Sequence, residues 1–201
     1  MASRAIAWVK ENQGGSEFAD VLILHNRLTA TGVAIGTTPV AYRLDYKLET
    51  DYGFTTLGLL VTARGTGWSR KLDLRRNRRG RWSARTDSGG DTDLPAPGGD
   101  TSTFSEALDC DLGLSPLTNS MPVLRHGLLQ GGGPVDFLMA WVSVPDLAVR
   151  ASRQRYTFVR AQGDGAIVRY ESLDSDFTAD IAFDRDGLVV DYPGIGRRIG
   201  G

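Results

Sequence analysis

The sequence predicts a mainly β protein in which antiparallel strands form a single domain spanning residues 1–201. Three observations predict this fold class. Hydrophobic and polar residues alternate with a period of two along most of the chain, and turn-forming residues separate the alternating runs. The 201 residues are 41% hydrophobic, so the chain can bury one full core. Many short strands with short connections are typical of a β-roll, barrel or sandwich.

The clearest alternation lies in residues 40–49, where Val40, Tyr42, Leu44 and Tyr46 fall on one face and mostly charged residues fall on the other. This pattern predicts a half-buried antiparallel strand. The same alternation predicts strands at residues 56–63, 69–75 and 177–184. Further strands are expected at residues 5–10, 17–24, 28–35, 81–85, 135–144, 154–160, 166–172 and 188–192.

Turn residues separate these runs at NRRG (77–80), GDG (163–165) and DRDG (184–187), where Gly187 can adopt a positive φ. The stretch GGDTDLPAPGG (89–99) is predicted to be a long flexible loop.

The strand FLMAWVSV (137–144) is apolar on both faces, so it needs cover on each side. Residues 115–122 are the expected source of that cover. Ser115 followed by Pro116 is typical of an N-cap and a first helical residue, and Pro122 disfavours helical geometry in the residue before it. We therefore expect a helical turn from Pro116 to about Met121, lying against or across a highly curved sheet.

The charge balance gives no overall reason to expect a nucleic acid or an anionic membrane as partner, because 23 basic residues face 24 acidic ones. The charges are nevertheless segregated. Residues 64–85 hold nine basic side chains and one acid, whereas residues 87–111 hold seven acids and no base. A solvated hairpin followed by a solvated acidic loop is one interpretation, and a basic site for a phosphate or carboxylate headgroup is the other.

Cys110 is the single cysteine, so no disulfide can form within the chain. It is interpreted as a small buried thiol rather than a nucleophile. The N-terminus lacks the pattern of a secretion signal and no apolar run is long enough to span a membrane, so a cytoplasmic location without integral membrane association is expected. No residue spacing indicates a metal site, and no nucleotide motif indicates a cofactor.

Asp109 and Asp111 would share one face of a strand, where close carboxylates raise one another's pKa and could supply one proton donor and one acceptor. Alternatively, together with Asn119 and Arg125 they could bind sugar hydroxyls. Aromatic faces for such a ligand could come from Trp82, Trp141, Tyr156 or Tyr192. A purely structural interpretation stays open, in which Asp109, Asp111, Thr118 and Asn119 satisfy the backbone of a tight corner.

Four other residues have two interpretations each. Glu17 lies in an apolar strand, where it either faces solvent or is buried with a partner such as Arg125 or Tyr192. His126 is either a general base or an ordinary, partly exposed histidine. Gln154 and Tyr156 point the same way on one strand, so they either reach a pocket or bond to the neighbouring sheet.

The string LDCDLGLSPLTNSMPVLR (108–125) is similar to the most characteristic motif of the "Putative glycolipid-binding" family, in which Asp-x-Asp-Leu is followed by Thr-Pro-Phe-Thr-Asn-Thr-Leu-Pro-Ile-Arg. Ser115, Leu117 and Met121 depart from that pattern. The family's other landmarks occur in the expected order: Trp8, Glu17, GVAIG (32–36), GRW (80–82), AWVSVPDLAV (140–149), QRYTF (154–158) and FTADIAFDRDGLVVDYPG (177–194).

The resemblance implies a spiral β-roll, a long curved antiparallel sheet wrapped around a short central helix, that binds a glycolipid or another amphiphilic or hydrophobic small molecule. The residues expected to contact this ligand are Glu17, Trp82, Asp109, Asp111, Thr118, Asn119, Arg125, Trp141, Gln154, Tyr156 and Tyr192.

The alternative function is a cofactor-independent cyclase, isomerase or hydrolase acting on a small hydrophobic metabolite in the same cavity. Its acid and base groups would be Asp109, Asp111, Glu17 or His126. A structural interaction module is a third possibility. No cofactor and no nucleic acid partner are expected, and the chain could be a monomer or a homodimer.

Overall fold

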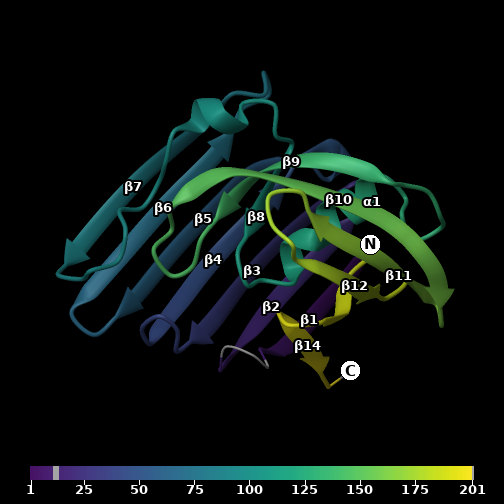
Figure 1. The fold of residues 1–201 in the computed structure, drawn as a ribbon, viewed down its shortest axis with the longest axis horizontal. Coiled ribbons are helices and arrows are strands. Elements are labelled where there is room, and N and C mark those ends of the chain that lie inside the picture. The colour runs from purple at the N-terminus through teal and green to yellow at the C-terminus, as the bar shows by residue number, and fades with distance from the viewer. Residues whose placement is uncertain (11–13, 201) are drawn as a thin grey trace.

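The computed structural model describes residues 1–10 and 14–200, and the fourteen strands within them form one sheet. The strands are β1 (Ala2–Lys10), β2 (Gly15–Leu24), β3 (Arg27–Gly36), β4 (Tyr42–Thr50), β5 (Thr56–Gly65), β6 (Trp68–Arg76), β7 (Trp82–Gly90), β8 (Asp109–Leu112), β9 (Val135–Val142), β10 (Val149–Gln162), β11 (Gly165–Ser172), β12 (Thr178–Phe183), β13 (Val189–Tyr192) and β14 (Gly196–Ile199). Short 3-10 helices are η1 (Tyr52–Phe54), η2 (Thr101–Phe104) and η3 (Leu117–Asn119), and α1 (Ser120–Arg125) is the α-helix. The prediction of a mainly β fold with a short central helix is confirmed (Figure 1).

The strand order is β7-β6-β5-β4-β3-β2-β1-β14-β13-β12-β11-β10-β9-β8. Strands β1 to β7 and β9 to β14 therefore form two antiparallel meanders, which meet in the middle of the sheet where β1 pairs with β14. All pairs are antiparallel except β8 and β9, which run parallel. The sheet curves strongly, so that β9 and β10 cross over β3 to β5 in Figure 1.

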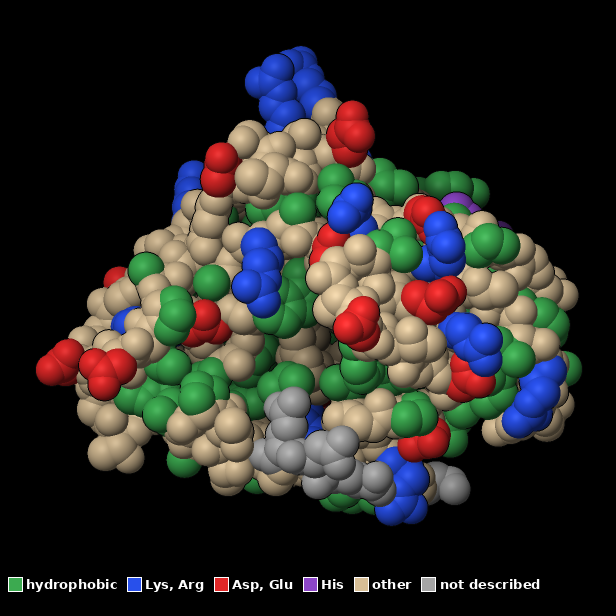
Figure 2. All heavy atoms as spheres, viewed as in Figure 1, with side chains coloured by type: hydrophobic (Ala, Val, Ile, Leu, Met, Phe, Trp, Pro, Cys, Tyr) green, Lys and Arg blue, Asp and Glu red, His purple; other side chains and the backbone are tan. Residues whose placement is uncertain are grey.

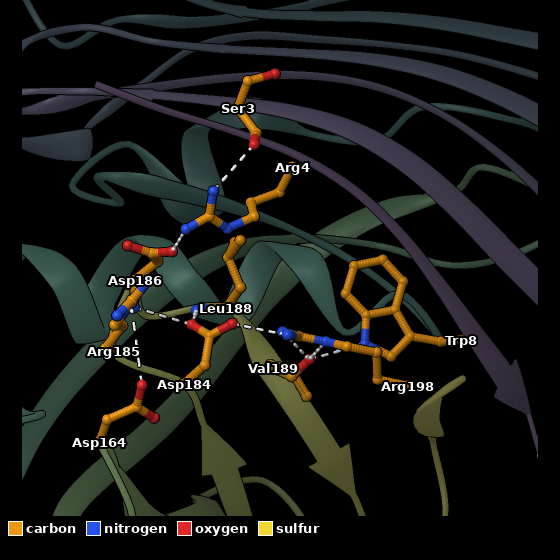
Figure 3. Close-up of polar contacts among 10 residues, drawn as sticks. All are labelled: Ser3, Arg4, Trp8, Asp164, Asp184, Arg185, Asp186, Leu188, Val189 and Arg198. Atoms are coloured by element: carbon orange, nitrogen blue, oxygen red, sulfur yellow. Dashed lines mark hydrogen bonds and ion pairs between the residues drawn. The ribbon is translucent and has the colours of Figure 1, made fainter. Parts of the chain in front are cut away.

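The seam between the two halves is fixed by side chains as well as by backbone pairing (Figure 3). The indole Nε1 of the fully buried Trp8 on β1 donates to the carbonyl of Val189 on β13 at 2.9 Å. Arg198 on β14 donates to the same carbonyl and, at 2.7 Å, to the carboxylate of Asp184. These contacts tie β1 and β14 to β13 and to the turn before it, so the two halves of the chain form one continuous sheet.

The core fills the inside of the curve. Alternate residues of β4 are buried as the period-two pattern predicts, and Leu48 and Leu59 belong to one large cluster. Leu117 and Met121 of the helical segment are fully buried in that cluster, while Val123 of α1 joins a second cluster formed mainly by β9 to β13. The helical segment therefore packs between the two halves of the sheet, where burial of its apolar side chains contributes most to stability.

The helical segment differs from the prediction in two ways. Ser115 is not a helix cap, because its hydroxyl donates to Glu17 and no side chain caps η3. The helix also continues beyond Met121, since α1 runs from Ser120 to Arg125 and includes Pro122. Pro122 lies in the first turn of α1, where a backbone N–H has no partner within the helix, so its missing N–H costs little.

Several boundaries also differ. β7 extends to Gly90 and β10 begins at Val149, both well outside the predicted runs, and β14 was not among the expected strands. β8 is the strand on which Asp109 and Asp111 were expected to lie, although no bounds were predicted for it. The loop at 89–99 is anchored, because Gly98 accepts a hydrogen bond from the amide of Val149 and donates one to the carbonyl of Leu147. Gly187 has a φ of 75°, as its turn motif predicts.

Figure 2 shows where charges gather on one face of the molecule. Acidic and basic side chains are interspersed on the right of this face, hydrophobic side chains gather at its lower left, and a group of Lys and Arg side chains projects from its top. Within residues 1–10 and 14–200, no helix is long and apolar enough to cross a membrane.

Candidate functional site

A pocket of about 160 Å³ lies where the loop after β8 faces the inner side of the curved sheet. We call it the polar recess. Its lining combines three polar side chains, Asp111, Ser115 and Asn119, with four aromatic ones. The lining residues are Asp111, Leu112, Gly113, Leu114, Ser115, Asn119, Trp141, Tyr170, Phe177, Tyr192 and Ile195.

A larger pocket of about 600 Å³, which we call the long groove, adjoins the recess. The two share Trp141, Tyr170 and Phe177 as a common wall. The groove is further lined by Thr103, Leu138, Arg150, Ala151, Ser152, Arg153, Ser172, Asp174 and Ser175. The polar recess therefore borders a longer groove that is lined by both polar and apolar side chains, and the three shared aromatic side chains form the wall between them.

Asp111 on β8 is the acidic group of the recess. Its Oδ1 accepts from the hydroxyl of Thr118 at 2.8 Å, and its Oδ2 accepts from the amide Nε2 of Gln154 at 2.7 Å. Among the described residues, no Lys, Arg or His forms an ion pair with it. Burial raises the pKa of Asp111; the bonds from Gln154 and Thr118 oppose this, and the nearby Asp109 adds to it.

Asn119 is held in place by a second set of bonds. Its Nδ2 donates to the carbonyl of Pro116 at 3.2 Å, and its Oδ1 lies 2.8 Å from the hydroxyl of Tyr156, which is also 3.2 Å from Gln154 Oε1. Burial raises the pKa of Tyr156 well above its ordinary value, so this hydroxyl keeps its proton. Gln154 and Tyr156 therefore lie behind the recess and orient Asp111 and Asn119, respectively.

Asp109 and Arg125 form a buried ion pair beside the recess. Arg125 donates through both terminal nitrogens to the two carboxylate oxygens of Asp109, with Nη1 at 2.7 Å from Oδ1. Asp109 is 1% exposed, and its burial raises its pKa while Arg125 lowers it. The guanidinium also lies 5.7 Å from the centre of the Phe137 ring. Neither member of the pair lines the recess, so its direct effect is on the packing of α1 against β8.

Glu17 is buried with partners other than those expected. Its Oε1 accepts from the hydroxyls of Tyr46 at 2.8 Å and Ser115 at 2.6 Å, and its Oε2 lies 3.5 Å from Nζ of the buried Lys10. Arg125 and Tyr192 are not its partners, because the curvature of the sheet brings β4 and the loop after β8 to β2. Burial, followed by the charge of Glu17, raises the pKa of Tyr42 to about 12.

The structure thus separates the predicted ligand contacts into four groups. Asp111, Asn119, Trp141 and Tyr192 line the recess, while Thr118, Gln154 and Tyr156 lie directly behind it. Glu17, Asp109 and Arg125 form buried pairs nearby, and Trp82 lies in the core, where its Nε1 donates to the carbonyl of Ala107 at 2.9 Å. His126 is exposed and its ring packs edge-on to Phe137.

Sequence reasoning missed Tyr170 and Phe177 as lining residues. Both lie in or beside strands that were predicted, and the missing signal was their pairing: Tyr170 is opposite Tyr156 on β10 and opposite Ala179 on β12. Inward-facing aromatic residues on adjacent strands could have indicated a stacked aromatic wall. The structure contains such a wall, because the ring centre of Tyr170 lies 5.4 Å from that of Tyr156 and 6.0 Å from that of Tyr192.

Cys110 is fully buried, and burial raises the pKa of its thiol to about 12. A thiol with such a pKa is not a nucleophile at neutral pH. Across residues 1–10 and 14–200, no cluster of three or more His, Cys, Asp or Glu side chains could hold a metal ion.

We expect Asp111→Asn to raise the melting temperature at neutral pH. Because the folded pKa of Asp111 lies above the unfolded one, ionising it penalises only the folded state; stability therefore falls as pH rises between these two values and stays reduced above them. Asparagine cannot ionise, so the variant loses this decline. Melting curves of both proteins across acid to neutral pH would show a difference that grows with pH.

The matched control is Asp136→Asn, whose effect has the opposite sign. The bond from Arg155 lowers the pKa of the exposed Asp136, so this carboxylate stabilises the protein above its unfolded pKa and the benefit is lost in acid. A difference between wild type and Asp111→Asn that is constant with pH would contradict the assignment of an uncompensated buried carboxylate.

The comparisons with known proteins agree with this fold. The family model described as "Putative glycolipid-binding" matches residues 5–198. A crystal structure of a DUF1089 family protein from Pseudomonas aeruginosa superposes with a TM-score of 0.68, at 28% sequence identity, covering 91% of this chain and 92% of that one. Among the curated proteins, none matches this chain. Since the family model spans nearly the whole sequence, the chain belongs to the "Putative glycolipid-binding" family.

Proposed function

We propose that this protein binds an amphiphile whose polar headgroup is a sugar or a similar polyhydroxyl group. The observation that carries the proposal is the polar recess, in which Asp111 and Asn119 face four aromatic side chains. Each Asp111 oxygen accepts one hydrogen bond from the protein, which leaves lone pairs to accept hydroxyl groups of a ligand. The faces of Trp141 and Tyr192 suit the apolar side of a sugar ring.

The long groove supports an amphiphilic ligand rather than a free sugar. Leu138, Ala151 and Phe177 offer apolar surface that begins at the aromatic wall of the recess. A headgroup bound at Asp111 would therefore have its aglycone directed past Trp141 into this groove. The volume of about 600 Å³ is within the range of pockets that bury drug-sized ligands. The family name is consistent with such a ligand.

The test uses n-octyl β-D-glucoside below its critical micelle concentration, with methyl glucoside and octanol as the two halves of the ligand. We expect isothermal titration to give a lower Kd for octyl glucoside than for either half. Asp111→Leu should weaken binding about 10- to 100-fold, because a ligand hydroxyl loses a charged acceptor. Asp136→Leu, on the outer surface, is the matched control and should leave the Kd unchanged. Equal affinity for octanol and octyl glucoside would overturn a headgroup site.

A second candidate function, cofactor-independent catalysis in the recess, is favoured by one observation. Asp111 is a half-buried carboxyl with a raised pKa and no cationic partner among the described residues, which is the environment of a general acid. Asp111→Asn distinguishes the two functions, since an enzyme would lose turnover of a bound amphiphile while a carrier would show no turnover in either form.

A further inference from the structure

The turn between β6 and β7 carries three exposed arginines, Arg78, Arg79 and Arg81, which we call the arginine tip. This turn is the uppermost loop of the ribbon in Figure 1, and the group of basic side chains that projects from the molecule in Figure 2 lies at the same place. The tip thus extends beyond the body of the sheet, where solvent surrounds it.

The backbone of the turn is ordered by Asn77. Its Oδ1 accepts from the amides of Arg79 at 2.9 Å and Arg81 at 3.0 Å, and Gly80 closes the turn with a φ of 79°. These bonds use backbone N–H groups, so the three arginine side chains have no part in forming the turn. Their replacement should leave the hairpin intact.

The charge of the tip is not neutralised by the protein. Within the part of the chain that the structure describes, none of the three arginines makes a salt bridge. Arginines on the outer faces of the strands differ, because cross-strand carboxylates pair with them: Arg155 lies 2.6 Å from Asp136, and Arg169 lies 2.7 Å from Asp180. The tip therefore offers unpaired positive charge to an external partner.

The base of the hairpin is fixed to the segment that leads to the candidate site. Arg76 Nε and Trp82 Nε1 both donate to the carbonyl of Ala107, at 3.1 and 2.9 Å. Ala107 lies two residues before Asp109, the first residue of β8, the strand that also carries Asp111. The tip is thus held in a defined orientation relative to the polar recess and the long groove.

We propose that the arginine tip docks the protein onto an anionic lipid bilayer. A flat, densely charged surface suits three cations on a narrow projection, and each arginine near such a surface contributes roughly a fivefold increase in affinity. A nucleic acid fits less well, since its binding proteins present extended basic tracks and exposed aromatic residues, whereas Trp82 next to the tip is buried. The inference goes beyond the proposed function, because docking depends on the tip and not on what the recess binds.

The test is cosedimentation with vesicles of equimolar phosphatidylglycerol and phosphatidylcholine, free of glycolipid. We expect the protein to bind these vesicles and not vesicles of phosphatidylcholine alone, with binding that weakens as salt is added. R78Q/R79Q/R81Q should reduce the partition coefficient on the order of a hundredfold. It should retain its melting temperature and its affinity for octyl glucoside.

The charge-matched control is R43Q/R155Q/R169Q, which removes three arginines that are paired on the outer faces of the strands. It should bind the anionic vesicles like the wild type. Equal loss in both triple variants would show that net charge rather than the tip is responsible, and would overturn the proposal. The proposal would also be overturned if the wild-type protein did not bind anionic vesicles, or if it bound DNA in preference to them. Failure of octyl glucoside binding with intact vesicle binding would instead reject only the proposed function.

Discussion

Replacing Arg125 by methionine is expected to lower the free energy of unfolding by about 3–5 kcal/mol. Arg125 supplies the charge that compensates Asp109, which is 1% exposed and accepts from both terminal nitrogens of the guanidinium. Without Arg125, the carboxylate of Asp109 stays buried beneath α1 with neither a counter-ion nor water to solvate it. Urea unfolding at neutral pH, followed by tryptophan fluorescence, measures the change.

A rescue and a surface control sharpen this prediction. The double variant D109L/R125M removes both charges, so it should recover most of the lost stability. R155M breaks the exposed pair between Arg155 and Asp136, which solvent screens, and should therefore lower the free energy of unfolding far less than R125M does. If R125M costs no more than R155M, Asp109 is not ionised in the folded protein and the pair has no structural role.

The fold could be predicted from the sequence because local hydrophobic alternation and turn residues determine where most strands form. Alternation in residues 40–49 reflects a strand with one face on the core, and Gly187 is required by a turn with positive φ. The bounds of β8 were not predicted because it has only four residues, and β14 was not expected because its four residues, Gly-Arg-Arg-Ile, show no hydrophobic alternation. Both are strands only through their neighbours, β9 for the one and β1 and β13 for the other.

Only part of the candidate site could be predicted from the sequence, because some of its residues meet only through the curvature of the sheet. Asp111 and Asn119 could be found because they belong to one short motif, and that motif does line the recess. Tyr170 and Phe177 come from the opposite wall, more than fifty residues further along the chain, and reach the recess only because the sheet curves. Curvature depends on the sum of many strand twists and has no local sequence signal.

The partners of Glu17 illustrate the same limit. Burial in an apolar strand was one of its two expected interpretations, and the structure places it there with Lys10, Tyr46 and Ser115. Lys10 is seven residues from Glu17 in the sequence, and its pairing with Gly15 on β2 brings the two side chains close in space. Ser115 is distant, and its contact requires that the helical segment be packed inside the sheet.

Glu17→Ala should also cost about 3–5 kcal/mol in the free energy of unfolding. It leaves the ammonium group of Lys10, a residue only 5% exposed, without a counter-ion, and it removes the acceptor of Tyr46 and Ser115. Ser115 lines the polar recess, so the wall of the recess should shift as well. Urea unfolding and octyl glucoside titration, performed on the same sample, would report both effects.

Two further variants separate charge from hydrogen bonding at Glu17. Glu17→Gln retains an acceptor for Tyr46 and Ser115 but loses the charge, so it should be intermediate in stability and bind octyl glucoside like the wild type. The pKa of Tyr42, which burial and then Glu17 raise to about 12, should fall in this variant and be visible by ultraviolet titration. K10M/E17L removes both charges and should be more stable than Glu17→Ala. If Glu17→Gln instead destabilises the protein as much as Glu17→Ala, the charge on Lys10 dominates and the bond to Ser115 contributes little to the shape of the recess.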